Sequence, residues 1–440
     1  MARKLFGTDG VRGVAGEFLT AELALALGQA ATRRTGADRP QVLIVRDTRQ
    51  SGEMLQAALA AGVSAAGGDV LLGGVLPTPA APLLIARYGF DLAAVLSASH
   101  NPYRDNGIKF FAADGYKLSD DDEAAIEREL EPDSSTAPPA SIGHIRELRG
   151  APEDYLRELH TRFVDLDLSG LHVVLDCANG ATYQVAPEIF RRLGAEASVM
   201  ADAPDGRNIN ADCGSTHIGA LAERVVAGGH EIGFAFDGDG DRVLAVDGSG
   251  ELVDGDELMA LVTLHLRDSG RLVGNGVAVT VMTNYGFHAA MRDEGVSVAT
   301  TQVGDRYVLE ELRARGWTLG GEQSGHIIDM GFNHTGDGIA SALLTLEALA
   351  GANLRDRHAM SKLPQRLVNV SVRDRGALEG AQEVEMAVRE AAGQLEGRGR
   401  VLVRPSGTEP LVRVMVEAPT DEEAQEVCGR LVALVERELG

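Results

Sequence analysis

A serine and three aspartates, far apart in the chain, stand in segments that suit phosphoryl chemistry. Ser99 lies in the run SASHNP, and Asp237, Asp239 and Asp241 alternate with glycine in the run DGDGDR. An isolated serine after a strand is usually a helix cap or a turn residue, but polar neighbours crowd this one. A phosphoserine carries about two negative charges, and a metal bound by carboxylates can neutralise them. The pair of segments predicts a hydroxyl that carries a phosphoryl group beside a divalent metal.

The aspartate run has two other interpretations, a solvated turn and the opening of an EF-hand loop. An EF-hand needs glycine and a closing glutamate at positions where this chain has Arg242 and Gly248, so that interpretation fails. Alternating glycines allow three carboxylates to point at one centre. Few protein oxygens together with a phosphate of the ligand suit Mg²⁺ better than Ca²⁺.

Lysine occurs at only four positions, Lys4, Lys109, Lys117 and Lys362, among 41 basic residues. In a chain that otherwise uses arginine, a lysine close to Ser99 indicates a titratable amine, and we expect Lys109 to act as a general acid or base. No lysine follows a glycine, so a Walker-type nucleotide loop is absent.

Two further loops carry groups that could hold a phosphorylated sugar. Glu322 and Ser324 flank Gln323 in the run GGEQSGH, and a carboxylate beside a hydroxyl suits vicinal sugar hydroxyls, although a structural turn is the alternative. His326 ends that run, and such a histidine is more often structural than catalytic. An anion clamp is predicted near the C-terminus from two arginines, two hydroxyls and a glycine, namely Arg404, Ser406, Gly407, Thr408 and Arg413.

The elements that position these loops repeat three times. An apolar strand, a polar loop, a helical pattern, glycine and a second strand recur from Val42, from Val173 and from Val277. Strands that alternate with helices predict parallel or mixed sheets sandwiched by helices. Each copy ends in a strand that delivers one of the loops, and ligands gather beyond the carboxyl ends of such strands. The fold class is α/β, with three related α/β sandwich domains and a smaller C-terminal α+β domain around a central cleft; the expected boundaries are 1–150, 151–253, 254–365 and 366–440.

The amino-acid composition excludes several classes of partner and location for this protein. The formal charge of −24 makes nucleic acid an improbable ligand, because binding to its backbone needs a basic surface. Three scattered cysteines form neither a disulfide framework nor a metal motif. No apolar signal core or membrane span is apparent, so we expect a cytoplasmic enzyme.

With these motifs in place, the chain resembles the α-D-phosphohexomutases almost from end to end, and among them the bacterial branch that acts on glucosamine phosphates. The resemblance is carried by these runs: FGTDGVRG (6–13), the Ser99 loop through Phe111, NIN (208–210) with CGSTH (213–217), the aspartate loop, VGDRYV (303–308), the Glu322 loop and the Arg404 loop.

The resemblance implies roles for individual residues. Ser99 would be the phosphoserine, and its phosphate would join Asp237, Asp239 and Asp241 around one Mg²⁺. The transferring group would be surrounded by Arg12, His100, Lys109 and Arg242. Glu322 and Ser324, in the loop that ends at His326, would hold the sugar, and the Arg404 loop with Arg413 would grip the phosphate that is not reacting.

The implied reaction interconverts glucosamine 6-phosphate and glucosamine 1-phosphate through a 1,6-bisphosphate of glucosamine or glucose, which also primes the enzyme. This reaction would feed the synthesis of UDP-N-acetylglucosamine and of the cell wall. The family allows a homodimer, and Ser99 would first be loaded by a kinase, by autophosphorylation or by a bisphosphate.

Asp305 marks the glucosamine branch, because hexose-type relatives have histidine or lysine in the loop after Val-Gly. We hypothesise that its carboxylate favours a protonated amino group on the sugar. Gln323 and Ser97 point to the same branch. The alternatives are a phosphomannomutase or phosphoglucomutase with the same residues, and a sugar-phosphate sensor without catalysis.

Overall fold

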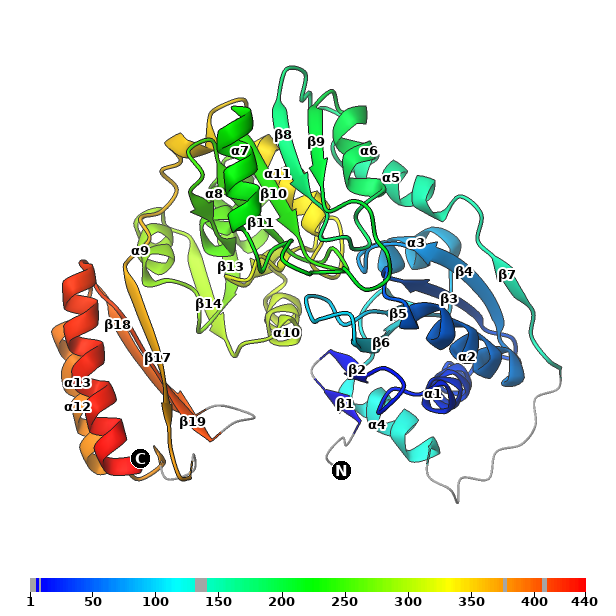
Figure 1. Ribbon diagram of the computed structural model, residues 1–440, viewed down its shortest axis with the longest axis horizontal. Helices are drawn as coiled ribbons and strands as arrows, with labels where there is room; N and C mark the ends of the chain where they lie inside the picture. The colour runs from blue at the N-terminus through cyan, green and yellow to red at the C-terminus, as the bar shows by residue number, and fades with distance from the viewer. Residues whose placement is uncertain (1–4, 8, 131–140, 375–377, 406–409) are drawn as a thin grey trace. The chain divides into compact units, whose positions relative to one another are not determined.

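The computed structural model describes residues 5–7, 9–130, 141–374, 378–405 and 410–440. The chain divides into two compact units, which are described separately. The first comprises Met1–Val281 and Ala299–Arg357, and the second comprises Met282–Val298 and His358–Gly440. The described residues form sheets of seven, five, four and three strands, flanked by helices (Figure 1). The prediction of an α/β fold with mixed sheets and a smaller C-terminal sheet is confirmed.

The seven-stranded sheet runs in the order β1-β2-β6-β5-β3-β4-β7. Strand β3 pairs in parallel with β4 and β5, whereas β6 is antiparallel to β5. Helices α1 and α2 cover one face and bury Leu27 and Leu59 against Ile44, and α3 lies on the other face (Figure 1). The elements are β1 Phe6–Gly7, β2 Gly10–Val14, α1 Ala21–Arg34, β3 Gln41–Arg46, α2 Ser51–Ala65, β4 Asp69–Val75, α3 Ala80–Tyr88, β5 Leu92–Leu96, β6 Asp105–Ala112, α4 Asp120–Glu129 and β7 Ile145–Glu147.

The five-stranded sheet follows in the order β12-β11-β10-β8-β9. Strands β8, β9 and β10 are parallel, and β11 returns antiparallel to β10, so that the aspartate run forms the connection between β10 and β11. The elements are α5 Ala151–Arg162, β8 His172–Asp176, α6 Val185–Arg192, β9 Glu196–Met200, α7 Gly219–Gly228, β10 Ile232–Phe236, β11 Val243–Asp247 and β12 Leu252–Val253.

The four-stranded sheet has the order β14-β13-β15-β16. Helix α8 begins with a capping box, in which Asp254 accepts from the backbone of Glu257 and Glu257 accepts in return. The elements are α8 Gly255–Asp268, the short 3₁₀ helix Val273–Asn275, β13 Gly276–Thr280, α9 Tyr285–Asp293, β14 Ser297–Thr301, α10 Asp305–Arg315, β15 Leu319–Gly321, β16 Ile327–Asp329, α11 Gly338–Leu349 and a second 3₁₀ helix Leu354–Asp356.

The C-terminal sheet is antiparallel in the order β17-β19-β18 and packs on two helices. Its elements are β17 Gln365–Ser371, α12 Gln382–Gln394, β18 Arg400–Pro405, β19 Leu411–Glu417 and α13 Asp421–Leu439. All three cysteines are buried and unpaired, as expected. Among the helices described, none combines the length and the apolarity needed to cross a lipid bilayer.

Candidate active site

The loop after β5 holds Ser99 in an unusual backbone conformation. Ser99 is 1% exposed and its φ is 53°, in the left-handed region that residues other than glycine rarely adopt. Its backbone N–H donates to Ser97 Oγ at 2.9 Å, and its carbonyl oxygen accepts from Arg49 Nη2 and from Asn210 Nδ2, each at 2.9 Å. Strain of this kind persists only where the surroundings fix it, so the Ser99 hydroxyl is held in one place.

Arg49 is the main support of that loop, and sequence reasoning gave it no role. Its side chain is fully buried, and its guanidinium pairs with Asp47 at 2.8 Å. It also donates to the carbonyl oxygen of Asn101 at 2.8 Å and to that of Asp105 at 3.1 Å. The signal was available in the sequence, since Asp47 and Arg49 directly follow a buried strand, as Ser99 does.

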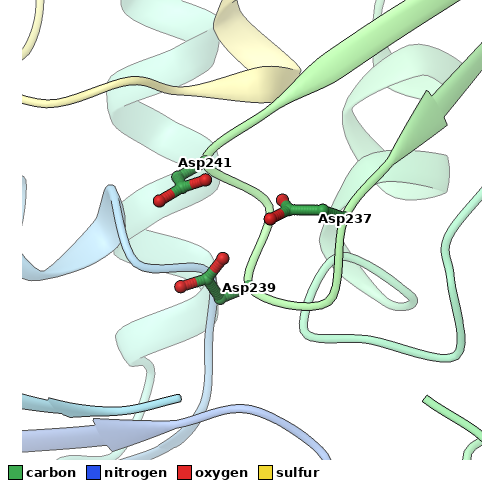
Figure 2. Close-up of side chains that lie close together, drawn as sticks. All are labelled: Asp237, Asp239 and Asp241. Carbon is green, nitrogen blue, oxygen red and sulfur yellow. The ribbon is translucent and has the colours of Figure 1, made fainter. Parts of the chain in front are cut away.

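The aspartate run forms a tight connection in which the three carboxylates face one another (Figure 2). Asp237 and Asp239 are fully buried and Asp241 is 4% exposed, which excludes the interpretation as a solvated turn. Gly240 has a φ of 69°, and a Cβ on Gly238 would lie 2.6 Å from the carbonyl oxygen of Ser99. Glycine at these two positions therefore allows the Ser99 loop and the aspartates to approach closely.

The cluster leaves two carboxylate oxygens without a hydrogen bond among the described residues. One oxygen from each aspartate lies within 4.8 Å of the others. Oδ1 of Asp239 and Oδ1 of Asp241 are buried and have no hydrogen-bond partner among the described residues. Burial raises the pKa of Asp237 well above its ordinary value, and the charges of Asp241 and Asp239 raise it further. Buried carboxylate oxygens in surplus fit a hard divalent cation.

Ser99 lies against this cluster. Its hydroxyl donates to Asp237 Oδ2 at 2.5 Å, and His100 Nδ1 lies 3.3 Å from the same hydroxyl oxygen. The pKa of His100 is lowered to about 4 by burial, by Arg242 and by Arg12, so the imidazole is neutral near pH 7. The structure thus brings the serine, the aspartates and the histidine together.

Lys109 projects from β6 into the same cluster and is 1% exposed. Its Nζ lies 2.9 Å from Asp239, 3.0 Å from Asp9 and 3.7 Å from Asp241. Burial alone would lower the pKa of Lys109, but the carboxylates of Asp239 and Asp9 raise it above its ordinary value. Lys109 is therefore an ammonium ion here, which can donate a proton or stabilise negative charge. Its expected role as a general acid or base stays a prediction.

Two arginines complete the positive surroundings. Arg12 pairs with Asp9. Burial alone would lower the pKa of Arg12, but the carboxylates of Asp9, Asp239 and Asp241 raise it above its ordinary value. Arg242 donates its backbone N–H to Asp237 at 3.2 Å, and its buried Nε has no hydrogen-bond partner in the described ranges. Thr78, which the sequence did not single out, donates its hydroxyl to Asp239 at 2.7 Å.

The Glu322 loop connects β15 to β16 and touches the aspartate loop. Glu322 is 8% exposed and accepts from the Gly304 N–H at 3.0 Å. Ser324 Oγ is buried and has no hydrogen-bond partner within the described part of the chain. His326 lies between two carboxylates, with Nδ1 3.6 Å from Asp241 and Nε2 3.8 Å from Asp305. The loop thus holds a buried hydroxyl without a hydrogen bond in the described ranges, and His326 contacts the aspartate cluster.

The predicted anion clamp lies in the second unit. Arg404 on β18 is the register partner of Arg413 on β19. Burial lowers the pKa of Arg404 from its ordinary value, and the like charge of Arg413 lowers it further. Arg413 Nε is buried without a hydrogen-bond partner in the described ranges. Ser406, Gly407 and Thr408 lie outside the described residues.

Comparison with known proteins covers the whole chain. Four family models match, and their descriptions are the three alpha/beta/alpha domains and the C-terminal domain of phosphoglucomutase/phosphomannomutase. The matched residues are 3–137 for domain I, 153–250 for domain II, 254–368 for domain III and 367–434 for the C-terminal domain.

Individual relatives agree with these models. The chain is 51% identical over 436 residues to the phosphoglucosamine mutase of Moorella thermoacetica, which covers 97% of this chain and 98% of the relative. A crystal structure of a phosphoglucomutase/phosphomannomutase family protein from Burkholderia thailandensis has a TM-score of 0.82 at 24% identity and covers 99% of this chain and 98% of its own. The N-acetylphosphoglucosamine mutase of Aspergillus fumigatus, solved with GlcNAc-6P and magnesium, has a TM-score of 0.71 at 18% identity and covers 100% of this chain and 96% of its own. From its matched domains and its sequence identity over nearly its full length, this chain belongs to the phosphoglucomutase/phosphomannomutase family.

Proposed function

We propose that this enzyme interconverts glucosamine 6-phosphate and glucosamine 1-phosphate through a phosphoserine at Ser99. One observation carries the proposal: a buried serine hydroxyl in a fixed conformation lies 2.5 Å from a cluster of three buried carboxylates with an ammonium beside it. The substrate is supported by the 51% identity to a phosphoglucosamine mutase.

In the first half-reaction, the bond between phosphorus and Ser99 Oγ breaks and a bond to the free hydroxyl oxygen of the sugar forms. Ser99 Oγ gains a proton and the sugar hydroxyl loses one. In this proposal, Lys109 stabilises the charge on the transferring group and gives a proton to Ser99 Oγ, and neutral His100 accepts the proton from the sugar hydroxyl. In the second half-reaction, the other phosphoryl group of the 1,6-bisphosphate passes back to Ser99. Positioning and charge neutralisation are what such a transfer needs most.

A divalent cation, Mg²⁺ in this proposal, would be held by Asp237, Asp239, Asp241 and an oxygen on Ser99, and it would neutralise charge on the transferring phosphoryl group. Two buried carboxylate oxygens that make no hydrogen bond among the described residues, one on Asp239 and one on Asp241, support this assignment. Magnesium is also present in the related fungal enzyme with its sugar phosphate.

The rest of the substrate would be held by two loops. Glu322, Ser324 and His326 would face the sugar, and the uncommitted Ser324 hydroxyl supports that role. The phosphate that is not reacting would be gripped by the clamp of Arg404, Ser406, Gly407, Thr408 and Arg413, and the like charges of the two arginines support an anion there. A role in supplying precursors for UDP-N-acetylglucosamine and the cell wall follows from the same proposal. A homodimer and the source of the first phosphate stay predictions.

Turnover of alternative sugar phosphates tests the proposal. The purified chain, primed with glucose 1,6-bisphosphate in Mg²⁺ buffer, should convert glucosamine 1-phosphate with a kcat/KM at least about tenfold above that for glucose 1-phosphate or mannose 1-phosphate. Ser99→Ala is the control for contaminating mutase. A preference for glucose or mannose phosphate would replace the proposal with a phosphoglucomutase or phosphomannomutase. Binding without turnover of any of them would replace it with a sugar-phosphate sensor.

A further inference from the structure

Lys117 joins two carboxylates that come from different parts of the chain. It lies on the hairpin after β6, where it bridges to Phe111 across the turn. Its Nζ lies 2.5 Å from Asp9 and 2.5 Å from Asp305, and its side chain is 11% exposed. Asp305 is the first residue of α10, which belongs to the region of the four-stranded sheet. The attraction between charges this well buried is stronger than between charges on the surface, because water screens it less.

Asp9 contacts both Lys117 and Lys109, one with each of its carboxylate oxygens. Its Oδ1 faces Lys117, and its Oδ2 lies 3.0 Å from Lys109 Nζ. Burial alone would raise the pKa of Asp9, but Lys109 and Lys117 hold it well below its ordinary value, so Asp9 is a carboxylate. The result is a row of alternating charges, Asp305, Lys117, Asp9 and Lys109, which we call the charge row.

Two of the carboxylates next to Lys109 belong to the cluster that could hold a cation, so they differ from Asp9. Asp239 and Asp241 lie 2.9 Å and 3.7 Å from Lys109, and both belong to the cluster that fits a cation. Of the three carboxylates that pair with Lys109 in the described residues, Asp9 is the one outside that cluster. Asp9 is therefore the partner that can fix the ammonium while the cluster is engaged.

We propose that Lys117 and Asp305 are positioning residues, which act through Asp9 to hold the Lys109 ammonium against the transferring phosphoryl group. The proposal rests on the proposed phosphoryl transfer and deepens it. It also gives Asp305 a different task from the one expected from the sequence, because its carboxylate would govern the rate of transfer and not the choice of sugar.

Arg306 provides a matched control. It follows Asp305 on α10 and also bridges to the hairpin region, through an ion pair with Asp120 and a 3.1 Å contact to Glu123. Neither of these two ion pairs involves Lys109 or Asp9. A purely structural role in joining the two regions would make Arg306 and Lys117 equally important, whereas a role through Lys109 would not.

The test measures kcat and KM of Lys117→Met, Asp305→Asn, the double variant and Arg306→Gln with glucosamine 1-phosphate and glucose 1-phosphate. Small displacements of a catalytic group cost up to about 100-fold, so Lys117→Met should lose about 10- to 100-fold in kcat with KM changed less than about twofold. Lys117→Arg should recover most of the loss, and the double variant should lose no more than the worse single variant.

Arg306→Gln should stay within about twofold of the unsubstituted enzyme in kcat, and the ratio between the two sugars should be unchanged in Asp305→Asn. Equal losses in Arg306→Gln and Lys117→Met, or a normal kcat in Lys117→Met, would overturn the charge row. A changed sugar ratio in Asp305→Asn would return that residue to substrate choice. If the unsubstituted enzyme is inactive with both sugars, the proposed function fails and the charge row is rejected with it.

Discussion

Two regions of this chain concentrate charge, and they do so in opposite ways. Around Ser99 in the first unit, buried carboxylates lie beside buried cations. Lys109 by itself contacts three carboxylates, those of Asp9, Asp239 and Asp241. In the second unit, Arg404 stands beside Arg413, and burial together with the like charge of Arg413 lowers the pKa of Arg404. In the first region, charges of opposite sign lie together and stabilise one another. In the second, two positive charges lie together and repel each other.

The difference matches the two functions proposed for these regions, phosphoryl transfer in the first and phosphate binding in the second. A site where bonds are made and broken needs groups in fixed positions, and hydrogen bonds from several directions fix Ser99. A site that only grips a phosphate gains more from positive charge that nothing yet neutralises, because the ligand then supplies the missing partner. Substitutions in the first region should therefore reduce kcat, and those in the second should raise KM.

The largest effect is expected at Ser99. Ser99→Ala removes the oxygen that carries the phosphoryl group, so kcat should fall by at least about three orders of magnitude. The circular dichroism spectrum and the thermal midpoint should stay close to those of the unsubstituted enzyme, because the backbone contacts of Ser99 do not involve its hydroxyl. Retention of more than a tenth of the activity would show that this region is not the site of transfer.

A smaller effect is expected at the arginine pair. Arg404→Gln or Arg413→Gln removes a charge-assisted contact worth about 1.5–3 kcal/mol, which corresponds to a rise in KM of about 10- to 100-fold with kcat little changed. Arg366→Gln is the matched control, since this arginine lies on the neighbouring strand β17 and pairs with Asp421 on the surface. Steady-state kinetics would contradict the contrast between the two regions if the arginine variants lost kcat instead.

The smallest effect on activity is expected at Asp337. This buried carboxyl group is held by hydrogen bonds from Tyr155 and from the backbone of Ala340. It accepts from Tyr155 at 3.0 Å and caps α11, and burial raises its pKa to about 6. Because this pKa lies above the value of about 3.9 in the unfolded chain, the contribution of Asp337 to stability is present below pH 4 and is lost as the pH rises through 6.

The loss would amount to at most about 3 kcal/mol, and Asp337→Asn should abolish it. The single tryptophan, Trp317, reports unfolding of the first unit, so denaturant midpoints at pH 4 to 7 can be compared between the two proteins. Parallel pH profiles would show that hydrogen bonds alone keep this carboxylate at an ordinary pKa, which would weaken the comparison with the compensated cluster.

The repeated pattern of strands could be predicted because its signals are local. Apolar runs placed β3, β8 and β13 within a residue or so of their observed bounds. The strand that delivers the Glu322 loop, β15, consists of Leu319–Gly321 and contains two glycines. Glycine is a weak strand signal, and here it is required because a Cβ on Gly320 would lie 2.6 Å from the carbonyl oxygen of Ala278.

The domain boundaries expected near 150, 253 and 365 stay predictions. The grouping of Met282–Val298 with the C-terminal unit depends on packing that no local pattern reveals.

The candidate site was predictable where one segment carries the chemistry, as the Ser99 and aspartate loops do. It was not predictable where the chemistry arises from contacts between distant segments. Lys117 was noticed only as one of few lysines, since its partners Asp9 and Asp305 lie 108 and 188 residues away. Arg49 was passed over for the same reason, because its worth comes from carbonyl groups about 50 residues further on.

Transfer of an isotopic label tests the central claim most directly. The enzyme would be labelled with ³²P from glucose 1,6-bisphosphate, freed of excess label and mixed with unlabelled glucosamine 6-phosphate in a rapid-quench apparatus. The label should leave the protein within a single turnover and appear in glucosamine 1,6-bisphosphate and then in the monophosphates, and Ser99→Ala should take up none. Label that stays on the protein while unlabelled substrate is converted would contradict the account.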